Sequence, residues 1–234
     1  MRKPRLRFLL AASFIVVAGV AAFVIGRYVA SEDTPVDAQV QPSGTPVVVE
    51  KPPHPSIAAE MTAIAEDNKK PLFTGVLNGF TFIGQGTPFP RGDGACSNAQ
   101  LRALSSSEAR TAIRDSELDF QASDLPNGMR LVRETATLCN DDVVGAERVY
   151  EGSGDRVLEI GRTKTEPVFP AIAPKDRLSA LTIRGRPSVL VAPIGSSPTM
   201  PTIILMRDEE GTLWVINADG IDAAEARKVA EGVK

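Results

Sequence analysis

The longest apolar segment of the chain lies near its N-terminus. Residues 8–26 (FLLAASFIVVAGVAAFVIG) are nineteen consecutive positions without a charged side chain, and they follow the basic leader 1–7. At about 1.5 Å per helical residue the segment is about 29 Å long, close to the roughly 30 Å hydrocarbon core of a bilayer. The pattern predicts one transmembrane helix at residues 8–26, through which the protein binds the lipid bilayer.

The charges on either side of this segment predict its orientation. Basic residues precede it, whereas Arg27 is followed by Glu32, Asp33 and Asp37. The positive-inside rule places the N-terminus in the cytoplasm and the following chain outside. A cleaved signal peptide has the same layout and would give a secreted protein, which is the alternative. The apolar segment exceeds the usual signal-peptide length of about 7 to 15 residues, and this favours the uncleaved anchor.

Two shorter segments connect the predicted membrane helix to the rest of the chain. Residues 27–56 are rich in proline, which fixes φ and removes amide donors, so they predict a semi-rigid tether. Apolar residues then recur at helical spacing through residues 57–70, with Ser56 available as the N-cap. This amphipathic helix either joins the following domain or lies on its surface. Residues 71–234 are sufficient for one domain with its own core.

Beyond residue 70, runs of β-branched and aromatic residues alternate with turn residues, which is the pattern of β-strands. The pair Asn78 and Gly79 favours a tight turn between two short strands within residues 72–84. Because short spacers join several of the strands, we expect an antiparallel sheet built from hairpins. Further strands are predicted at residues 128–138, 143–151, 156–163, 178–184, 188–194, 202–207 and 212–217.

Helical patterns flank this strand-rich region. Residues 98–114 favour a helix interrupted at the serines 105–107. The C-terminal segment favours a helix that begins at Asp222, with Glu225 in a capping-box position. A sheet of hairpins with a few peripheral helices defines the α+β class. The single tryptophan, Trp214, lies in a predicted strand and is expected in the core.

The charge distribution excludes nucleic acid as a partner. Residues 71–234 carry 18 Lys and Arg against 22 Asp and Glu, and no run of basic residues follows residue 7. A surface that binds nucleic acid needs clustered basic side chains to displace counterions from phosphates. The short leader cannot form a cytoplasmic domain, so the function is expected outside the membrane.

Residues that commonly carry catalysis are scarce. The one histidine, His54, lies between Pro53 and Pro55 in the predicted tether, where nothing holds an imidazole in a site. This excludes Ser-His-Asp and Cys-His mechanisms and leaves too few ligands for a histidine-based zinc site. We therefore assign no catalytic, cofactor-binding or metal-binding residue, and we expect no cofactor. Paired carboxylates suffice for glycan hydrolysis, so a carboxylate-dependent envelope hydrolase stays open as an alternative.

Cys96 and Cys139 are the only cysteines, and both lie in the predicted external domain, where disulfides form. We predict a disulfide between them. Closing a loop of about 43 residues would stabilise the fold by roughly 4 kcal/mol through the unfolded state. Two separate buried thiols are the alternative, and the Cys-x-x-Cys spacing of a redox pair does not occur.

Residues 118–233 contain a recognisable order of motifs. LDFQASDLPNGMRLVRETA is followed by ERVYEGSGDRVLEI, then TIRGRPSVLVAP and EEGTLWVINADGIDAAEARKVAEGV. This order resembles the extracytoplasmic C-terminal domain of some membrane-anchored anti-sigma factors and sporulation-associated proteins. The resemblance implies a sheet domain outside the membrane that binds or senses. The chain departs from the family because residues 1–7 leave no room for the cytoplasmic anti-sigma domain.

These features lead to one expected function. The protein is predicted to be a single-pass, membrane-tethered binding or sensory domain on the extracytoplasmic side, for a protein, peptide or lipid ligand of the cell envelope, without catalysis. A structural or assembly subunit of a membrane complex is the first alternative. The carboxylate-dependent hydrolase is the second.

Overall fold

The computed structural model describes residues 57–87, 96, 100–154, 156–164, 166, 168–194 and 201–234. The predicted leader, membrane helix and tether lie outside these residues. Among the helices that are described, none is long and apolar enough to span a membrane.

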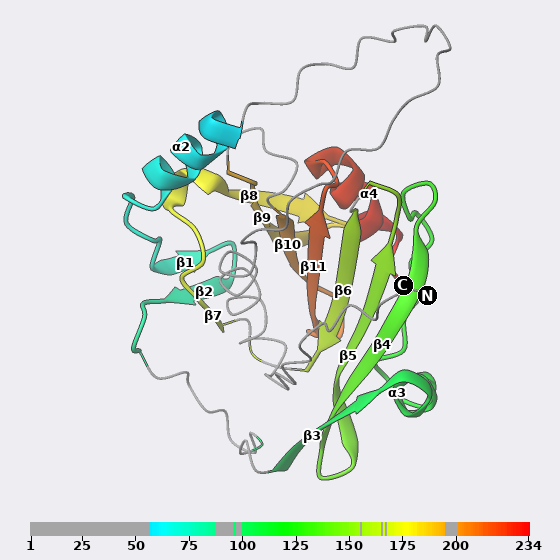
Figure 1. The fold of residues 1–234 in the computed structure, drawn as a ribbon. Coiled ribbons are helices and arrows are strands. Elements are labelled where there is room, and N and C mark those ends of the chain that lie inside the picture. Colours follow the sequence, from blue (N-terminus) through cyan, green and yellow to red (C-terminus); the bar gives the residue numbers. More distant parts are fainter. Residues whose placement is uncertain are drawn as a thin grey trace, which may run out of the picture.

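An eight-stranded antiparallel sheet forms the centre of the fold (Figure 1). Its strands lie in the order β3-β4-β5-β6-β11-β10-β9-β8. The chain builds it in two groups, β3 to β6 and β8 to β11, which meet where β6 pairs with β11 along its whole length. The strands are β3 (Leu101–Ser105), β4 (Arg130–Cys139), β5 (Asp142–Glu151), β6 (Val157–Thr163), β8 (Leu178–Ile183), β9 (Arg186–Val191), β10 (Thr202–Arg207) and β11 (Leu213–Asp219).

A three-stranded sheet packs on the larger one. The hairpin of β1 (Gly75–Leu77) and β2 (Phe80–Ile83) is the strand pair predicted around the Asn-Gly turn. The third strand, β7 (Val168–Pro170), lies in the connection between the two groups of the large sheet and pairs with β2 in parallel. This strand was not predicted, because three residues next to a proline carry too little pattern.

One of the predicted helices is partly a strand. Residues 101–105 form the edge strand β3, whereas the sequence pattern predicted a helix from residue 98. Pairing with β4 satisfies the backbone of this segment, and helix α3 (Ser106–Arg114) begins at the serines where a break was expected. The C-terminal helix α4 (Ala223–Gly232) starts as predicted, because the Asp222 side chain accepts a hydrogen bond from the Glu225 amide at 2.8 Å.

The first described helix, α2 (Ile57–Asp67), ends three residues before the predicted end. Its last residue, Asp67, is 8% exposed and pairs with Arg177 at 2.8 Å. Arg177 belongs to the 3-10 helix η3 (Lys175–Arg177), and the neighbouring Asp176 pairs with Lys70 at 2.5 Å. These two ion pairs attach the end of α2 to the start of β8.

One face of the eight-stranded sheet packs against α3 and α4, and we call it the helix face. Trp214 lies in its core, 2% exposed as predicted, with its ring 5.2 Å from that of Phe120. Helix α4 contributes Ala226, Val229 and Ala230, all fully buried. The small apolar stripe predicted for the C-terminal helix is therefore the surface that it buries.

The opposite face, which we call the β2 face, carries a second core between the two sheets. Phe80, Phe82 and Phe169 of the three-stranded sheet pack here against strands β8 to β11. The large sheet contributes Leu178, Val189, Val191, Ile203, Leu205, Leu213 and Val215. Among the described residues of this core, none comes from β4, β5 or β6. The structure is thus a sheet-rich α+β fold in which, among the described residues, the large sheet contributes to the second core through strands β8 to β11.

The turn between β1 and β2 supports a prediction. Asn78 and Gly79 have φ values of 53° and 87°, and the Asn78 amide donates to the Leu181 and Ser188 carbonyls at 3.0 and 2.8 Å. We expect N78A to lower the free energy of unfolding by about 1–3 kcal/mol, because it removes two hydrogen bonds and places alanine at positive φ. Urea denaturation measures the loss. N78G keeps the backbone conformation and should cost less; equal stability of all three proteins would contradict the assignment.

Candidate functional site

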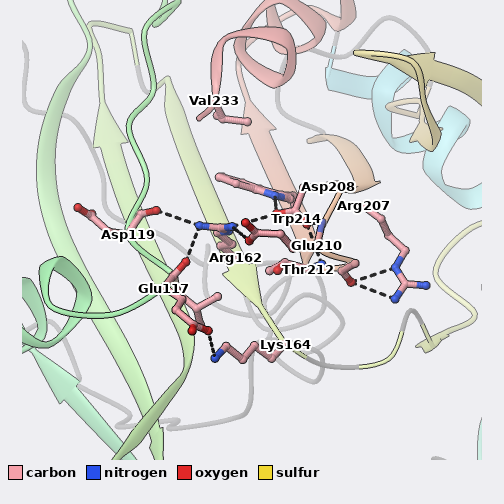
Figure 2. A network of polar contacts seen from close by, with 12 residues as sticks. Glu117, Asp119, Arg162, Lys164, Arg207, Asp208, Glu210, Thr212, Trp214 and Val233 are labelled. Atoms are coloured by element: carbon pink, nitrogen blue, oxygen red, sulfur yellow. Dashed lines mark hydrogen bonds and ion pairs between the residues drawn. The ribbon is translucent and has the colours of Figure 1, made fainter.

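A network of polar contacts surrounds Arg162 of β6 on the helix face (Figure 2). Its Nη1 atom donates to the backbone oxygens of Glu117 and Asp119 at 2.8 and 3.0 Å. Its Nη2 atom pairs with Asp208 at 3.0 Å and Glu210 at 3.1 Å. One guanidinium therefore joins the segment before β4 to the loop between β10 and β11.

Asp208 is the acceptor at the centre of this network. Its Oδ2 atom accepts from the Trp214 indole at 3.0 Å, and its Oδ1 atom accepts from the Thr212 amide at 2.8 Å. Burial raises the pKa of Asp208, but the hydrogen bonds from Trp214, Thr212 and Arg162 outweigh it and hold the pKa below its ordinary value. Both carboxylate oxygens are occupied, so Asp208 links separate segments of the fold and offers no free oxygen to a ligand.

A second network links α3 to the sheet. Glu134 of β4 is 4% exposed and accepts from Arg110 and Arg148, the latter at 3.0 Å. Arg148 also pairs with Asp119 at 3.0 Å and lies 4.7 Å above the Phe120 ring. Burial raises the pKa of Glu134, but the two arginines lower it further than burial raises it. This network is also internally paired.

A third group of polar residues lies on the β2 face, over strands β4, β5, β6 and β11, beside the second core. Arg133 of β4, Glu159 of β6 and Asn217 of β11 lie in one row across the sheet, because their strands pair in register through Val149 of β5. Glu147 lies two residues from Val149 on β5 and therefore points to the same face. We call Arg133, Glu147, Glu159 and Asn217 the Glu147–Glu159 cluster.

The two carboxylates of this cluster share one cation. The Arg133 Nη2 atom is 3.4 Å from Glu147 Oε1 and 4.0 Å from Glu159 Oε1. The Asn217 amide donates to Glu159 Oε2 at 3.0 Å, whereas its Oδ1 atom is buried and has no hydrogen-bond partner among the described residues. The cluster therefore contains two carboxylates against one guanidinium and an unpaired buried acceptor. The Arg162 network also contains an unpaired buried atom, Nε of Arg162, but its charges are paired.

The pKa of Glu147 also distinguishes this cluster from the other two networks. Burial and the neighbouring Glu159 carboxylate raise the pKa of Glu147, and the opposing effect of Arg133 is smaller. Carboxyl groups with raised pKa values are concentrated at functional sites. A raised pKa means that the ionised carboxylate destabilises the fold, so stability alone does not explain why the group is present. The Glu147–Glu159 cluster is thus the candidate functional site.

This environment predicts how Glu147 affects stability. The raised pKa means that its contribution is greatest below the ordinary value of 4.5 and is lost as the pH rises through the folded-state value. E147Q is neutral at every pH, so we expect its free energy of unfolding to rise relative to wild type between pH 4 and pH 7, as measured by urea denaturation. E151Q removes an exposed charge from the same strand and serves as the control. A wild-type protein that gains stability over E147Q with pH would contradict the assignment.

The structure places one pair of predicted site residues together. Cys96 and Cys139 form the predicted disulfide, with their Cα atoms 6.0 Å apart at the end of β4. His54, which was assigned no role, lies outside the described residues. Sequence reasoning did not identify the Glu147–Glu159 cluster. A polar residue inside the apolar strands VLEIGRT and LWVINAD was the available indication, but the register that joins four strands could not be deduced from it.

No family model matches the chain, and neither a curated protein nor a solved structure is significantly similar to it.

Proposed function

We propose that the chain is a membrane-tethered, extracytoplasmic binding domain without catalytic activity, and that its ligand binds at the Glu147–Glu159 cluster. The ligand is a peptide, protein or lipid of the cell envelope. The apolar segment 8–26 and the proline-rich tether 27–56 support the location. The Cys96–Cys139 disulfide is typical of proteins outside the reducing cytoplasm and supports it further.

The observation that carries the binding function is the difference in charge balance between the polar networks. The Arg162 and Glu134 networks pair their charges with internal partners and link separate segments of the fold. The Glu147–Glu159 cluster lies beside the second core, contains two carboxylates against one guanidinium, and leaves a buried amide oxygen unpaired. A buried polar atom without a partner costs about 1–3 kcal/mol, and a bound ligand would remove that cost.

Membrane fractionation tests the location. We expect the full-length protein to stay with the membranes during alkaline extraction, and we expect protease added outside to digest the domain after the tether. Recovery in the soluble fraction with residues 8–26 removed would establish the cleaved, secreted alternative. Co-purification of one partner at a fixed ratio would favour an assembly subunit instead.

A second candidate function, the carboxylate-dependent hydrolase, is favoured by the environment of Glu147. Glycosidases use one carboxyl group with a raised pKa beside a second that is ionised. Arg133 weighs against this, because it lies between Glu147 and Glu159, where a scissile bond would have to enter. Incubation of the full-length protein in detergent with envelope glycans separates the two functions. Hydrolysis that disappears in E147Q and E159Q would overturn the non-catalytic proposal.

A further inference from the structure

Strand β8 forms one edge of the eight-stranded sheet (Figure 1). It pairs with β9 over all six of its residues, and no other described strand lies on its outer side. Its residues Ser179, Ala180 and Thr182 are exposed. The outer side of an edge strand presents N–H and C=O groups with which another chain can pair. This edge is therefore a candidate interaction surface.

The turn after β8 shows which of its backbone groups face outward. Arg184 and Gly185 have φ values of 52° and 77°, which is the two-residue hairpin turn, so Ile183 forms a hydrogen-bonded pair with β9. Hydrogen-bonded pairs alternate along an antiparallel ladder. The residues whose N–H and C=O groups turn outward are therefore Leu178, Ala180 and Thr182.

Two of these outward N–H groups are free. The Leu178 N–H donates to the Lys175 oxygen within the chain. The N–H groups of Ala180 and Thr182 find no acceptor in the part of the chain that the structure describes. Each copy of the edge thus offers two donors, together with the C=O groups of the three outward residues.

Strand β8 also lacks the features that usually protect an edge. It contains no charged residue and no proline, which are the common obstacles to pairing with another chain. The opposite edge strand, β3, carries Arg102, whose side chain is 63% exposed. The edge strands β1 and β7 of the smaller sheet have three residues each. Among the described edge strands, β8 is the longest and carries no such protection.

We propose that β8 pairs in antiparallel fashion with β8 of a second copy of the chain, about a two-fold axis at Ala180. In this register Ala180 lies opposite Ala180 of the second copy, and Leu178 lies opposite Thr182. The four free N–H groups then donate to the C=O groups of Ala180 and Leu178. Because both copies use the same surface, the contact closes as a dimer. It goes beyond the function proposed above and does not depend on it.

Charges at the two ends of the strand favour a second copy as the partner. Asp176 and Arg184 each lie four residues from Ala180, so the two-fold axis brings Asp176 of each copy toward Arg184 of the other. The Asp176 side chain is 58% exposed, and its partner Lys70 is exposed as well, so the carboxylate stays accessible. The other two charges of η3 have partners within the chain. Within the strand no like charges face each other.

The side chains of β8 fit close pairing of the two strands. Its exposed positions are serine, alanine and threonine, which are small enough for the backbones to approach. The half-buried Leu181 lies opposite Ser179 of the second copy and would be covered further. A contact along one edge strand is small compared with the interface of a permanent dimer. We therefore expect a reversible dimer.

Sedimentation of the full-length protein in detergent, between about 1 and 100 μM, tests the proposal. We expect the dimer fraction to rise with concentration. A180E and A180K should each weaken the dimer by about 10-fold or more, because position 180 faces its own copy and like charges repel. An equimolar mixture of A180E and A180K should associate at least as tightly as wild type, since opposite charges then meet.

The matched controls are A103E and A103K. Ala103 is an exposed alanine in the middle of the opposite edge strand, β3, so these variants should dimerise like wild type. A protein that stays monomeric at every concentration overturns the proposal. Dimerisation that A180E and A180K leave unchanged, or that A103E and A103K weaken equally, overturns it because the contact would then lie elsewhere. A mixture of A180E and A180K that stays monomeric contradicts the two-fold register. Thermal denaturation verifies that each variant is folded.

Discussion

Replacing Arg162 with methionine is expected to lower the free energy of unfolding by about 3–5 kcal/mol, the typical cost of removing one partner from a buried ion pair. Arg162 is 9% exposed and holds two backbone carbonyls and the Asp208 carboxylate, all within 3.0 Å. R162M keeps the length of the stem but leaves these acceptors without their donor. It also removes the cation that lies 5.0 Å from the Trp214 ring.

Urea denaturation followed by tryptophan fluorescence measures the loss, because Trp214 is the only tryptophan and contacts the network. K164M is the matched control. Lys164 lies two residues away and pairs with Glu117, but both side chains are exposed, so this pair contributes little. Equal stability of R162M and K164M would show that the network is not a structural tie.

The pH dependence of the free energy of unfolding provides a second test of R162M. The pKa of Asp208 in the folded protein lies below its ordinary value of 3.8. Its contribution to stability is therefore complete above pH 3.8 and is lost as the pH falls through the folded-state value. R162M removes one of the hydrogen bonds that lower this pKa, so its stability should fall less steeply with acid than that of wild type.

The parts of the fold that local chemistry determines were predictable from the sequence. The Asn78–Gly79 turn follows from the ease with which both residues adopt positive φ, and the start of α4 follows from the Asp222 side chain as an N-cap. Strands with β-branched residues between turn signals lie close to their predicted positions. In each case the residues that determine the element are neighbours in the sequence.

Elements determined by distant partners were not predictable in the same way. The segment 101–105 has a helical composition but becomes strand β3, because the edge of β4 supplies its hydrogen bonds. The three residues of β7 form a strand only because β2 lies beside them. Tertiary pairing overrides local propensity in both places.

The candidate site depends on distant partners most of all. Arg133 and Asn217 are brought onto one face by the register of β4, β5, β6 and β11. A shift of one residue in any strand would turn its side chain to the other face. The sequence shows that carboxylates are present, but their proximity depends on strand register. It could therefore not show that Glu147 and Glu159 lie together.

Loss of the Cys96–Cys139 disulfide is the other change with a large expected effect. The bond closes a loop with a sequence separation of 43 that includes β3, α3 and all of β4. A cross-link of this length restricts the unfolded chain, so C96S/C139S should be less stable by about 4 kcal/mol. That is a large share of the roughly 5–15 kcal/mol available to a domain.

Two comparisons distinguish restriction of the unfolded chain from loss of packing as the cause of the lower stability. Wild type treated with a reductant and the untreated double variant should have the same urea midpoint, because neither contains the cross-link. Both should also show a steeper dependence of unfolding free energy on urea than oxidised wild type, since an unrestricted chain exposes more surface on unfolding. A reductant without effect on wild type would show that the bond does not stabilise the fold.

The same bond connects stability with location. If the N-terminal segment exports the domain, the disulfide forms outside; a protein lacking residues 1–30 stays in the cytoplasm, where thiols remain reduced. We expect this cytoplasmic protein to accumulate to lower levels, and C96S/C139S should not lower them further. In the exported protein the double substitution should lower accumulation strongly. Equal sensitivity in both compartments would contradict an extracytoplasmic site of folding, because the bond would then form on either side of the membrane.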